Sequence, residues 1–168
     1  MTGAGAAPAR FREVIGEFPT GVAVITCEGP DGPAGLTTNA VTSLSLDPLL
    51  MLVCFDNSSR TLEVVRTARR FAVNFLTADQ EDVARVFASK RVAREKFDGA
   101  THRIAHGVPV LDGALAWIAC DVRDLLPGGD HTIAVGAATH MAVGGGEPLV
   151  FHRGRYLSLA SEPRLPLP

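Results

Sequence analysis

Small hydroxyl and amide side chains gather in one stretch of the chain. Residues 35–46 read GLTTNAVTSLSL, which places five hydroxyl groups and one amide directly ahead of an apolar run. Such side chains offer both donors and acceptors, and they leave the backbone accessible to a flat heterocycle. The competing interpretation is an edge strand or turn with ordinary Ser and Thr decoration, and this stretch alone does not exclude it.

A second polar stretch, residues 56–61 (DNSSRT), lies where a strand is expected to end and a helix to begin. Free backbone N–H groups at a helix start, hydroxyls and one arginine form a good phosphate site without a glycine loop. Simple N-capping of the helix is the alternative. Two further polar segments, 129–132 (GDHT) and 153–156 (RGRY), would each be interpreted as a turn in isolation.

Motifs for several other chemistries are missing from the sequence. It contains no G-x-S-x-G elbow, no H-E-x-x-H and no Walker phosphate loop. His102 and His106 are four residues apart, but they lie in an irregular stretch with no carboxylate at ligand spacing, so no metal site is expected. Cys27, Cys54 and Cys120 lack a C-x-x-C pairing and follow apolar, strand-like runs, which indicates core residues.

The elements that must position these groups are mostly strands. Apolar periodicity, turn residues and capping signals predict the following ranges. Helices are expected at 9–17, at 60–69 and after a capping box at 77–80, and strands at 21–27, 34–40, 49–55, 71–76, 114–126, 131–143, 149–152 and 156–159. Residues 89–107 are interpreted as irregular and hold most of the local positive charge. This order favours a closed or partly closed antiparallel barrel over a Rossmann fold.

Composition excludes several broad classes of protein. The chain has 168 residues, 46% of them apolar, with 16 basic and 18 acidic side chains, which fits one globular domain without a nucleic-acid footprint. No apolar run could span a bilayer and no signal peptide is recognisable, so a cytoplasmic location is expected. We expect a flexible N-terminus at 1–9, the domain at 10–160 and a Pro-rich tail at 161–168.

Six short motifs, in this order, resemble the flavin reductase-like family. They are 18–22 (FPTGV), 35–48 (GLTTNAVTSLSLDP), 58–61 (SSRT), 70–76 (RFAVNFL), 129–132 (GDHT) and 153–156 (RGRY), and the resemblance covers about residues 11–160. These small NAD(P)H:flavin oxidoreductases supply reduced flavin to two-component monooxygenases. The resemblance implies a mostly β, Greek-key split barrel with a few peripheral helices, and a homodimer that binds FMN or FAD near the subunit interface. NADH or NADPH would be the hydride donor, and a separate flavin-dependent monooxygenase the partner.

The resemblance also implies a flavin site, carried over residue by residue. The ring and its polar edge would meet Thr37, Thr38, Asn39 and Ala40, with Thr42 and Ser43 beside them. The groove would be lined by Cys54, Phe55 and Asp56, and the flavin phosphate would be held by Ser59, Arg60 and Thr61. Val41 departs from the pattern, since many members carry an aromatic residue there.

Further positions match a loop over the cofactor and the nicotinamide site. Lys96 and Phe97 would belong to the loop, and His131, Arg153, Arg155 and Tyr156 to the nicotinamide nucleotide. His131 is the one candidate catalytic residue, as a positioning or hydrogen-bonding group, because hydride transfer from nicotinamide C4 to flavin N5 is the work of the two cofactors. An ordinary loop histidine is the alternative.

Two other functions share the same barrel. One is a flavin- or haem-binding protein that carries or senses its ligand without turnover, and the two nicotinamide-site motifs argue against it. The other is a pyridoxamine-phosphate oxidase-like enzyme, which is disfavoured because no basic cluster suits a second phosphorylated substrate.

Overall fold

The computed structural model describes residues 6–159; residues 1–5 and the segment 160–168, which contains the expected Pro-rich tail, lie outside the described part. Helix α1 (Ala6–Gly16) begins three residues before the predicted start. The helix thus includes residues 6–9, which the sequence assigned to a flexible N-terminus. Alanines favour helix and Pro8 is tolerated in a first turn, where its missing N–H costs no hydrogen bond.

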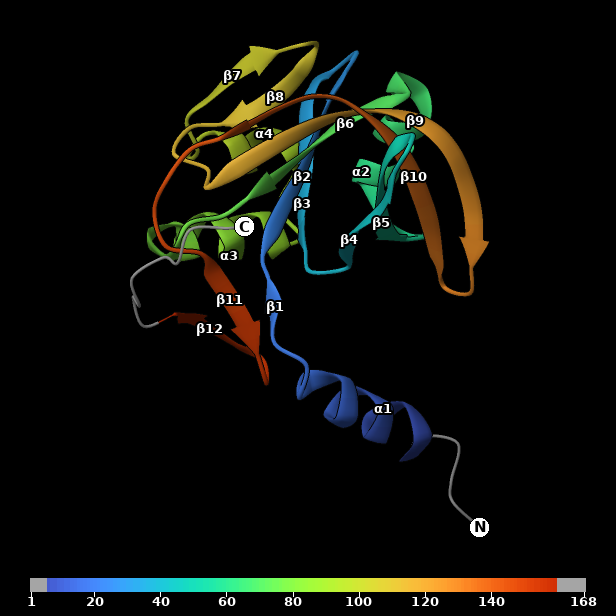
Figure 1. Ribbon diagram of the computed structural model, residues 1–168, viewed down its shortest axis with the longest axis vertical. Helices are drawn as coiled ribbons and strands as arrows, with labels where there is room; N and C mark the ends of the chain where they lie inside the picture. Colours follow the sequence, from blue (N-terminus) through green and yellow to red (C-terminus); the bar gives the residue numbers. More distant parts are fainter. Residues whose placement is uncertain (1–5, 160–168) are drawn as a thin grey trace.

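The main sheet has seven antiparallel strands in the order β3-β2-β6-β9-β10-β5-β4. Their bounds are β2 Ala23–Gly29, β3 Gly32–Thr38, β4 Val41–Leu46, β5 Leu49–Asp56, β6 Arg70–Phe75, β9 Ala116–Gly128 and β10 His131–Val143. Its two edge strands, β3 and β4, are separated along the chain by only Asn39 and Ala40. The sheet must therefore curl until its edges meet at that end, while they stay unpaired along their length (Figure 1). This is the partly closed barrel that the sequence predicted.

Two smaller sheets flank the barrel. One pairs β1 (Thr20–Gly21) with β11 (Leu149–His152) and β12 (Arg155–Ser158), which confirms the predicted C-terminal hairpin. The other pairs β7 (His102–Ala105) with β8 (Val108–Leu111).

The prediction that residues 89–107 are irregular was wrong in part. Helix α4 (Ala93–Phe97) and strand β7 lie there, each five residues long or shorter. Elements of that length show too little periodicity to be read from sequence. Tertiary contacts stabilise them instead: Phe97 is buried in α4, and Val108 and Val110 bury the partner strand β8 against the main sheet.

The core lies inside the curled sheet, and helices cover its open end and its outer face. Helix α2 (Arg60–Ala68) buries Leu62 and Val65 among the inward-facing side chains, including Phe55 and Phe71. The 3₁₀ turn η1 (Ala78–Gln80) and helix α3 (Glu81–Ala88) follow the predicted capping box, and Phe87 of α3 packs on the outer face of the sheet. Alternate residues of β2 face these two cores, so the strand is buried on both sides.

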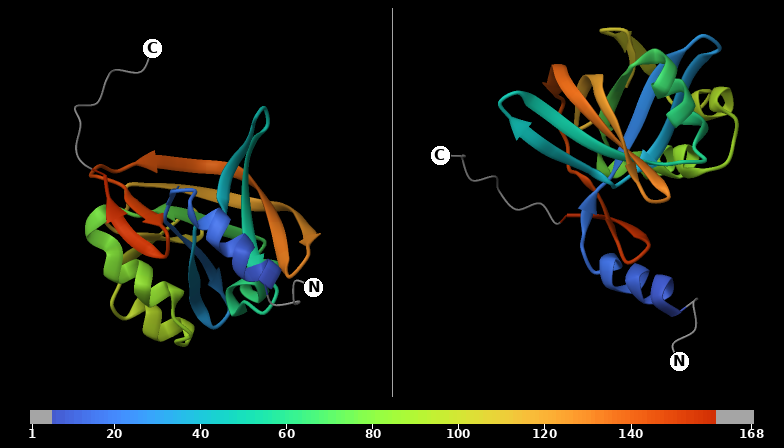
Figure 2. Two further views of the ribbon diagram at one scale, coloured as in Figure 1. Left: turned by 90° about the horizontal axis from the view of Figure 1, so that it is seen from below. Right: turned by 90° about the vertical axis from the view of Figure 1, so that its right-hand side faces the viewer.

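Two elements with exposed apolar side chains project from this body. Helix α1 extends away from the barrel, and so does the hairpin of β4 and β5, as both views of Figure 2 show. Within residues 6–159, no helix is both long enough and apolar enough to cross a membrane.

Candidate functional site

A groove of about 750 Å³ runs along strand β3. Its floor is Ala34–Thr38 of β3, together with Cys54 and Asp56 of β5. One wall is the start of α2, and the facing wall is the end of α3, the segment 89–91 and helix α4. His131, the first residue of β10, stands at its margin.

The start of α2 is fixed by the residues just before it. The Asp56 carboxylate accepts hydrogen bonds from the Ser58 N–H at 2.7 Å and the Ser58 hydroxyl at 2.6 Å. These bonds, with His131 nearby, lower the pKa of Asp56 and keep it ionised. The Ser59 hydroxyl accepts from Leu62 N–H at 3.4 Å and caps the helix. The capping interpretation of this stretch is thus correct, and the same residues line the groove.

Tertiary hydrogen bonds bring the 129–132 turn against this helix start. Asn57 N–H donates to the carbonyl of Asp130 at 3.0 Å, and the Thr132 hydroxyl donates to Asn57 Oδ1 at 2.7 Å. Nδ1 of His131 lies 2.7 Å from Oδ1 of Asp130, so the carboxylate orients the ring beside the groove. The motifs at 56–61 and 129–132, which are far apart in the sequence, therefore lie together at one end of the groove.

Arg60 connects the two walls. Its Nη2 donates to the carbonyls of Lys90 at 2.8 Å and Arg91 at 2.7 Å. A guanidinium has five N–H donors in a planar fork, so donors remain for an anionic ligand. The contact also fixes the segment 89–91, which supplies two more cations to the groove.

Lys96 is a buried cation on the groove wall. Its side chain is 7% exposed, and Nζ donates to the carbonyls of Phe87 at 2.9 Å and Gly35 at 3.2 Å. No carboxylate of residues 6–159 forms an ion pair with it. Burial, and secondarily the charge of Arg60, lower its pKa. A buried ammonium without a counter-ion is costly, and an anion in the groove would offset that cost.

The groove carries an excess of positive charge. Arg60, Lys90, Arg91 and Lys96 line it, against a single carboxylate, Asp56. The small residues and hydroxyls at the Thr37–Thr38 end leave room for a flat ring. The arrangement suits a ligand with an aromatic ring at one end and a phosphate at the other.

About half of the expected site residues meet in this groove. Those that line it are Thr37, Thr38, Cys54, Asp56, Ser59, Arg60, Thr61, Lys96 and His131. Their roles toward a flavin or a nicotinamide remain predictions. Their convergence from five separate elements is a finding of the structure.

Other expected residues lie elsewhere. Asn39 and Thr42 line a smaller hollow of about 370 Å³ with Phe18, on the side of α1. Ala40 and Ser43 are exposed beside it on the β3–β4 link and on β4. Phe55 points into the core, because alternate side chains of a strand face opposite sides, so its side chain does not line the groove as expected.

Phe97 also belongs to a core, where its ring packs edge-on against Phe87 at 4.9 Å between centroids. The expected nicotinamide turn lies on the β11–β12 hairpin, outside the groove. Arg153 pairs there with Glu17, with Nε and Oε2 2.9 Å apart, and Arg155 is exposed. Tyr156 packs on Phe151 and lies under the guanidinium of Arg85. Their role toward a nicotinamide stays a prediction.

Sequence reasoning missed the contribution of the segment 89–91. Ser89, Lys90 and Arg91 line the groove, although they belong to no recognised motif. The available signal was the local positive charge of residues 89–107, which had been assigned to an irregular stretch.

Comparisons with known proteins agree with this fold. The family model described as "Flavin reductase like domain" matches residues 15–160 of this chain. A flavin reductase of Pseudomonas putida is 37% identical over 157 residues, which cover 92% of this chain and 91% of that protein. A probable flavin reductase of Rhizobium meliloti is 39% identical over 90% of this chain, which spans only 49% of that longer relative.

Solved structures give the same result. Nitrilotriacetate monooxygenase component B from Mycobacterium thermoresistibile is 36% identical, with a TM-score of 0.90 over 98% of this chain and 94% of that one. The NADH:FAD oxidoreductase SgcE6 of Streptomyces globisporus, in complex with NAD and FAD fragments, is 36% identical, with a TM-score of 0.86 over 91% of this chain and 93% of that one. From its match over most of its length and from its split barrel, this chain belongs to the flavin reductase-like family.

Proposed function

We propose that this protein is an NAD(P)H-dependent flavin reductase, which reduces FMN or FAD and supplies the reduced flavin to a separate flavin-dependent monooxygenase. The observation that carries the proposal is the pair of cations, Arg60 and Lys96, on facing walls of a groove floored by small residues. Relatives that are reductase components of two-component monooxygenases support the monooxygenase partner.

The residues of the groove fit a flavin. Within residues 6–159, Lys96 has two carbonyl partners and no carboxylate partner, so an ammonium donor remains for a phosphate. The floor at Gly35 is tightly packed, because a Cβ there would lie 2.7 Å from Cε1 of Phe87 and a neighbour would have to shift. When both cofactors are bound, the nicotinamide provides the hydride and the flavin N5 accepts it.

The residues of this chain would bind and orient the two rings. Arg60, Ser59 and Thr61 would hold the phosphate, and Thr37 and Thr38 would face the ring. His131, oriented by Asp130, would position the nicotinamide at the groove margin. Donors among the residues that line the groove, such as Thr38 and Lys96, would stabilise negative charge on the reduced ring.

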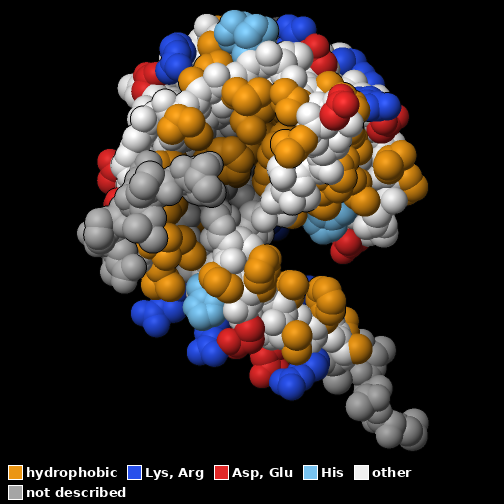
Figure 3. Space-filling model, in the orientation of Figure 1, with side chains coloured by type: hydrophobic (Ala, Val, Ile, Leu, Met, Phe, Trp, Pro, Cys, Tyr) orange, Lys and Arg blue, Asp and Glu red, His pale blue; other side chains and the backbone are white. Residues whose placement is uncertain are grey.

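We further propose that the protein is a homodimer. Apolar residues of and just after α1 are strongly exposed, including Phe11 at 69% and Phe18 at 66%, and so is Leu46 at 85% on the projecting hairpin. Figure 3 shows hydrophobic side chains of α1 beside the hollow between this helix and the barrel. Exposed apolar surface of this extent is typical of an interface, and a second copy is its proposed occupant.

The cytoplasm is the proposed location. Cys27, Cys54 and Cys120 are all free thiols, and free cysteines are usual in a reducing compartment.

A steady-state assay tests the enzymatic proposal. Purified protein is mixed with FMN or FAD and with NADH or NADPH, and nicotinamide oxidation is followed at 340 nm against flavin without protein. We expect turnover with at least one of the four pairs. If the absorbance at 340 nm stays constant with all four pairs, the protein is not a reductase. Flavin that co-purifies tightly without turnover would instead identify a carrier.

A further inference from the structure

The turn that leads into His131 is built from residues with much conformational freedom. It joins β9 to β10 through residues 128–130 (GGD), and His131 is the first residue of β10. The backbone of His131 pairs with Asp56 of β5 and with Gly128 of β9, at the last rung of each ladder. Gly129 takes a positive φ of 75°. Two adjacent glycines allow many alternative conformations, so the position of His131 depends on bonds from outside the turn.

Asn57 makes such bonds with its backbone and with both ends of its side-chain amide. Its backbone N–H donates to the carbonyl of Asp130 at 3.0 Å, and its Nδ2 donates to the carbonyl of Gly129 at 3.2 Å. Its Oδ1 accepts a hydrogen bond from the Thr132 hydroxyl at 2.7 Å. These partners lie on both sides of His131 in the sequence. Bonds on both sides restrict the backbone of the residue between them.

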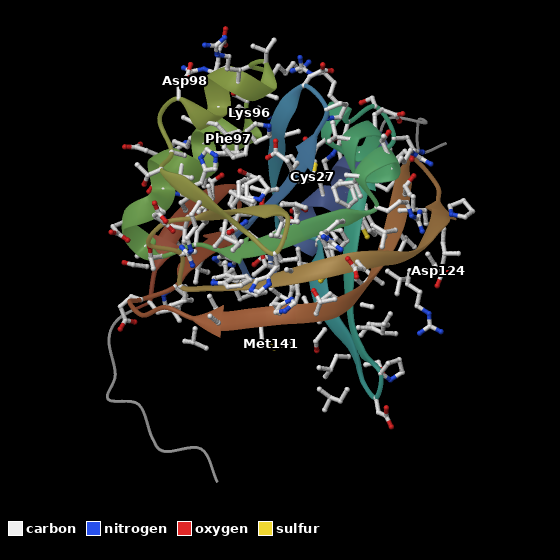
Figure 4. The ribbon with its side chains drawn as sticks, turned by 90° about the horizontal axis from the view of Figure 1, so that it is seen from above. Cys27, Lys96, Phe97, Asp98, Asp124 and Met141 are labelled. Atoms are coloured by element: carbon white, nitrogen blue, oxygen red, sulfur yellow. The ribbon has the colours of Figure 1, made fainter. Side chains whose placement is uncertain are left out.

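Arg66 of α2 strengthens this arrangement. Its Nη2 donates to the Thr132 hydroxyl at 3.1 Å, so that hydroxyl both donates and accepts. Thr132 is 6% exposed, and a buried hydroxyl that loses its partners is costly. In Figure 4 the end of β9 that leads into the turn, marked by Asp124, lies beside α2. We call Asn57, Arg66 and Thr132 the turn clamp, because together they tie the strand that carries His131 to α2 and the segment before it.

Asn57 lies outside the groove that its sequence neighbours line. Asp56, Ser58 and Ser59 belong to the groove, whereas the side chain of Asn57 bonds to the 129–132 turn. Asn57 is also exposed, so truncation of its side chain leaves the core intact. A change at this position should therefore affect the turn while the groove and the barrel stay as they are.

We infer that Asn57 is a positioning residue for the nicotinamide nucleotide: through the turn clamp it holds His131 at the groove margin in the orientation that the nicotinamide requires. The inference rests on the proposed function, which gives His131 that place. The segment 56–61 would also hold the flavin phosphate, so the clamp fixes His131 relative to the flavin. Such alignment matters because a misplacement of about 1 Å can lower a rate by about 100-fold.

Steady-state kinetics test the role of the clamp. Asn57→Ala removes both side-chain bonds and keeps the backbone bond. We expect the KM for NADH, or for NADPH if the wild type prefers it, to rise about fivefold, with the KM for flavin unchanged. Thr132→Val should act alike, and Thr132→Ser, which keeps the hydroxyl, should restore most of the loss. Thr139→Val is the matched control, because Thr139 also lies on β10 and its hydroxyl donates to the carbonyl of Ala119.

Two further measurements ask whether Asn57 acts through His131. In a His131→Ala background, Asn57→Ala should change the KM for the nicotinamide nucleotide by less than about twofold, because residues that act as one unit have effects that do not multiply. Hydrogen–deuterium exchange provides a readout without turnover. In the free protein, peptides that cover 126–133 should exchange about fivefold faster in Asn57→Ala than in the wild type, and peptides of β2 should exchange equally.

The outcomes separate this inference from the proposed function. A wild type that oxidises neither nucleotide would refute the reductase and the positioning role with it. If the wild type turns over, an unchanged KM in Asn57→Ala, or unchanged exchange at 126–133, would refute the positioning role alone. An equal rise in the KM for flavin would place Asn57 in the flavin site instead. Effects that multiply in the double variant would show that Asn57 acts independently of His131.

Discussion

Single charged residues decide what the groove can bind. Arg60 is already held by two carbonyls, and Lys96 is buried between two others, so both cations are positioned before any ligand arrives. Such preorganisation reduces the entropy that binding must overcome. The cost falls on the free protein, because no carboxylate in the described part of the chain neutralises the buried Lys96 ammonium.

Arg60→Ala should raise the apparent KM for flavin with little effect on kcat at saturating flavin. The phosphate is bound equally in the ground and transition states, so its loss changes binding and not the chemical step. Loss of a charge-assisted hydrogen bond of about 1.5–3 kcal/mol predicts a rise of about 10- to 150-fold. Steady-state kinetics measure it, with Arg123→Ala, an exposed arginine of β9, as control. An unchanged KM would remove Arg60 from the site.

The three thiols should differ in reactivity. Burial raises the pKa of Cys27 and of Cys120 to about 12, and both side chains are fully buried. Cys54 is half-buried in the groove, and its pKa is also raised by burial. The thiolate is the nucleophile, so we expect slow labelling of Cys54 alone by a maleimide in the native protein, and slower labelling with flavin present. Mass spectrometry after digestion identifies the site, and flavin-independent labelling would contradict its place in the groove.

At the scale of elements, β3 is the part on which the site depends. One strand forms the floor of the groove, anchors Lys96 through Gly35 and packs against α2, α3 and α4. Its position at the edge of the sheet leaves its outer side free for a ligand. A small change in this strand should therefore affect both stability and binding.

Gly35→Ala tests that dependence. The added Cβ would lie 2.7 Å from Cε1 of Phe87 and 2.9 Å from the carbonyl oxygen of Ile25. Either α3 or the β2–β3 pairing must shift, and overpacking of this kind costs about 1–3 kcal/mol. We expect a lower free energy of unfolding in urea and a higher flavin KM. At Gly145 nothing lies within 4 Å of the added Cβ, so Gly145→Ala is the control. An unaltered stability would show that Phe87 yields without cost.

At the scale of the whole molecule, the barrel is well packed while its two projections are not. Helix α1 and the β4–β5 hairpin expose large apolar side chains that the monomer does not cover. The hollow that contains Asn39 and Thr42 opens on the same side as Phe18. A second copy there would cover these residues, which the resemblance assigns to the flavin ring.

Phe11→Glu should convert a dimer into a monomer. Phe11 is 69% exposed in the single chain, so the variant should fold, while a carboxylate at an apolar interface is costly. Light scattering after gel filtration should give twice the 17.7 kDa chain mass for the wild type and the single mass for the variant. Glu13→Gln, on the opposite side of the same helix, should remain dimeric. A monomeric wild type would refute the homodimer.

Local signals in the sequence determined most of the secondary structure: hairpin turns, the capping box at Thr77 and the helix start at Ser59 depend on neighbouring residues. The ordered motifs determined the family. Only the tertiary structure decided that Lys96 is a buried cation held by two backbone carbonyls, that Phe55 points into the core, and that Lys90 and Arg91 reach the groove. Burial and the closing of a curled sheet are long-range effects, set by residues far apart in the chain, so no local pattern contains them.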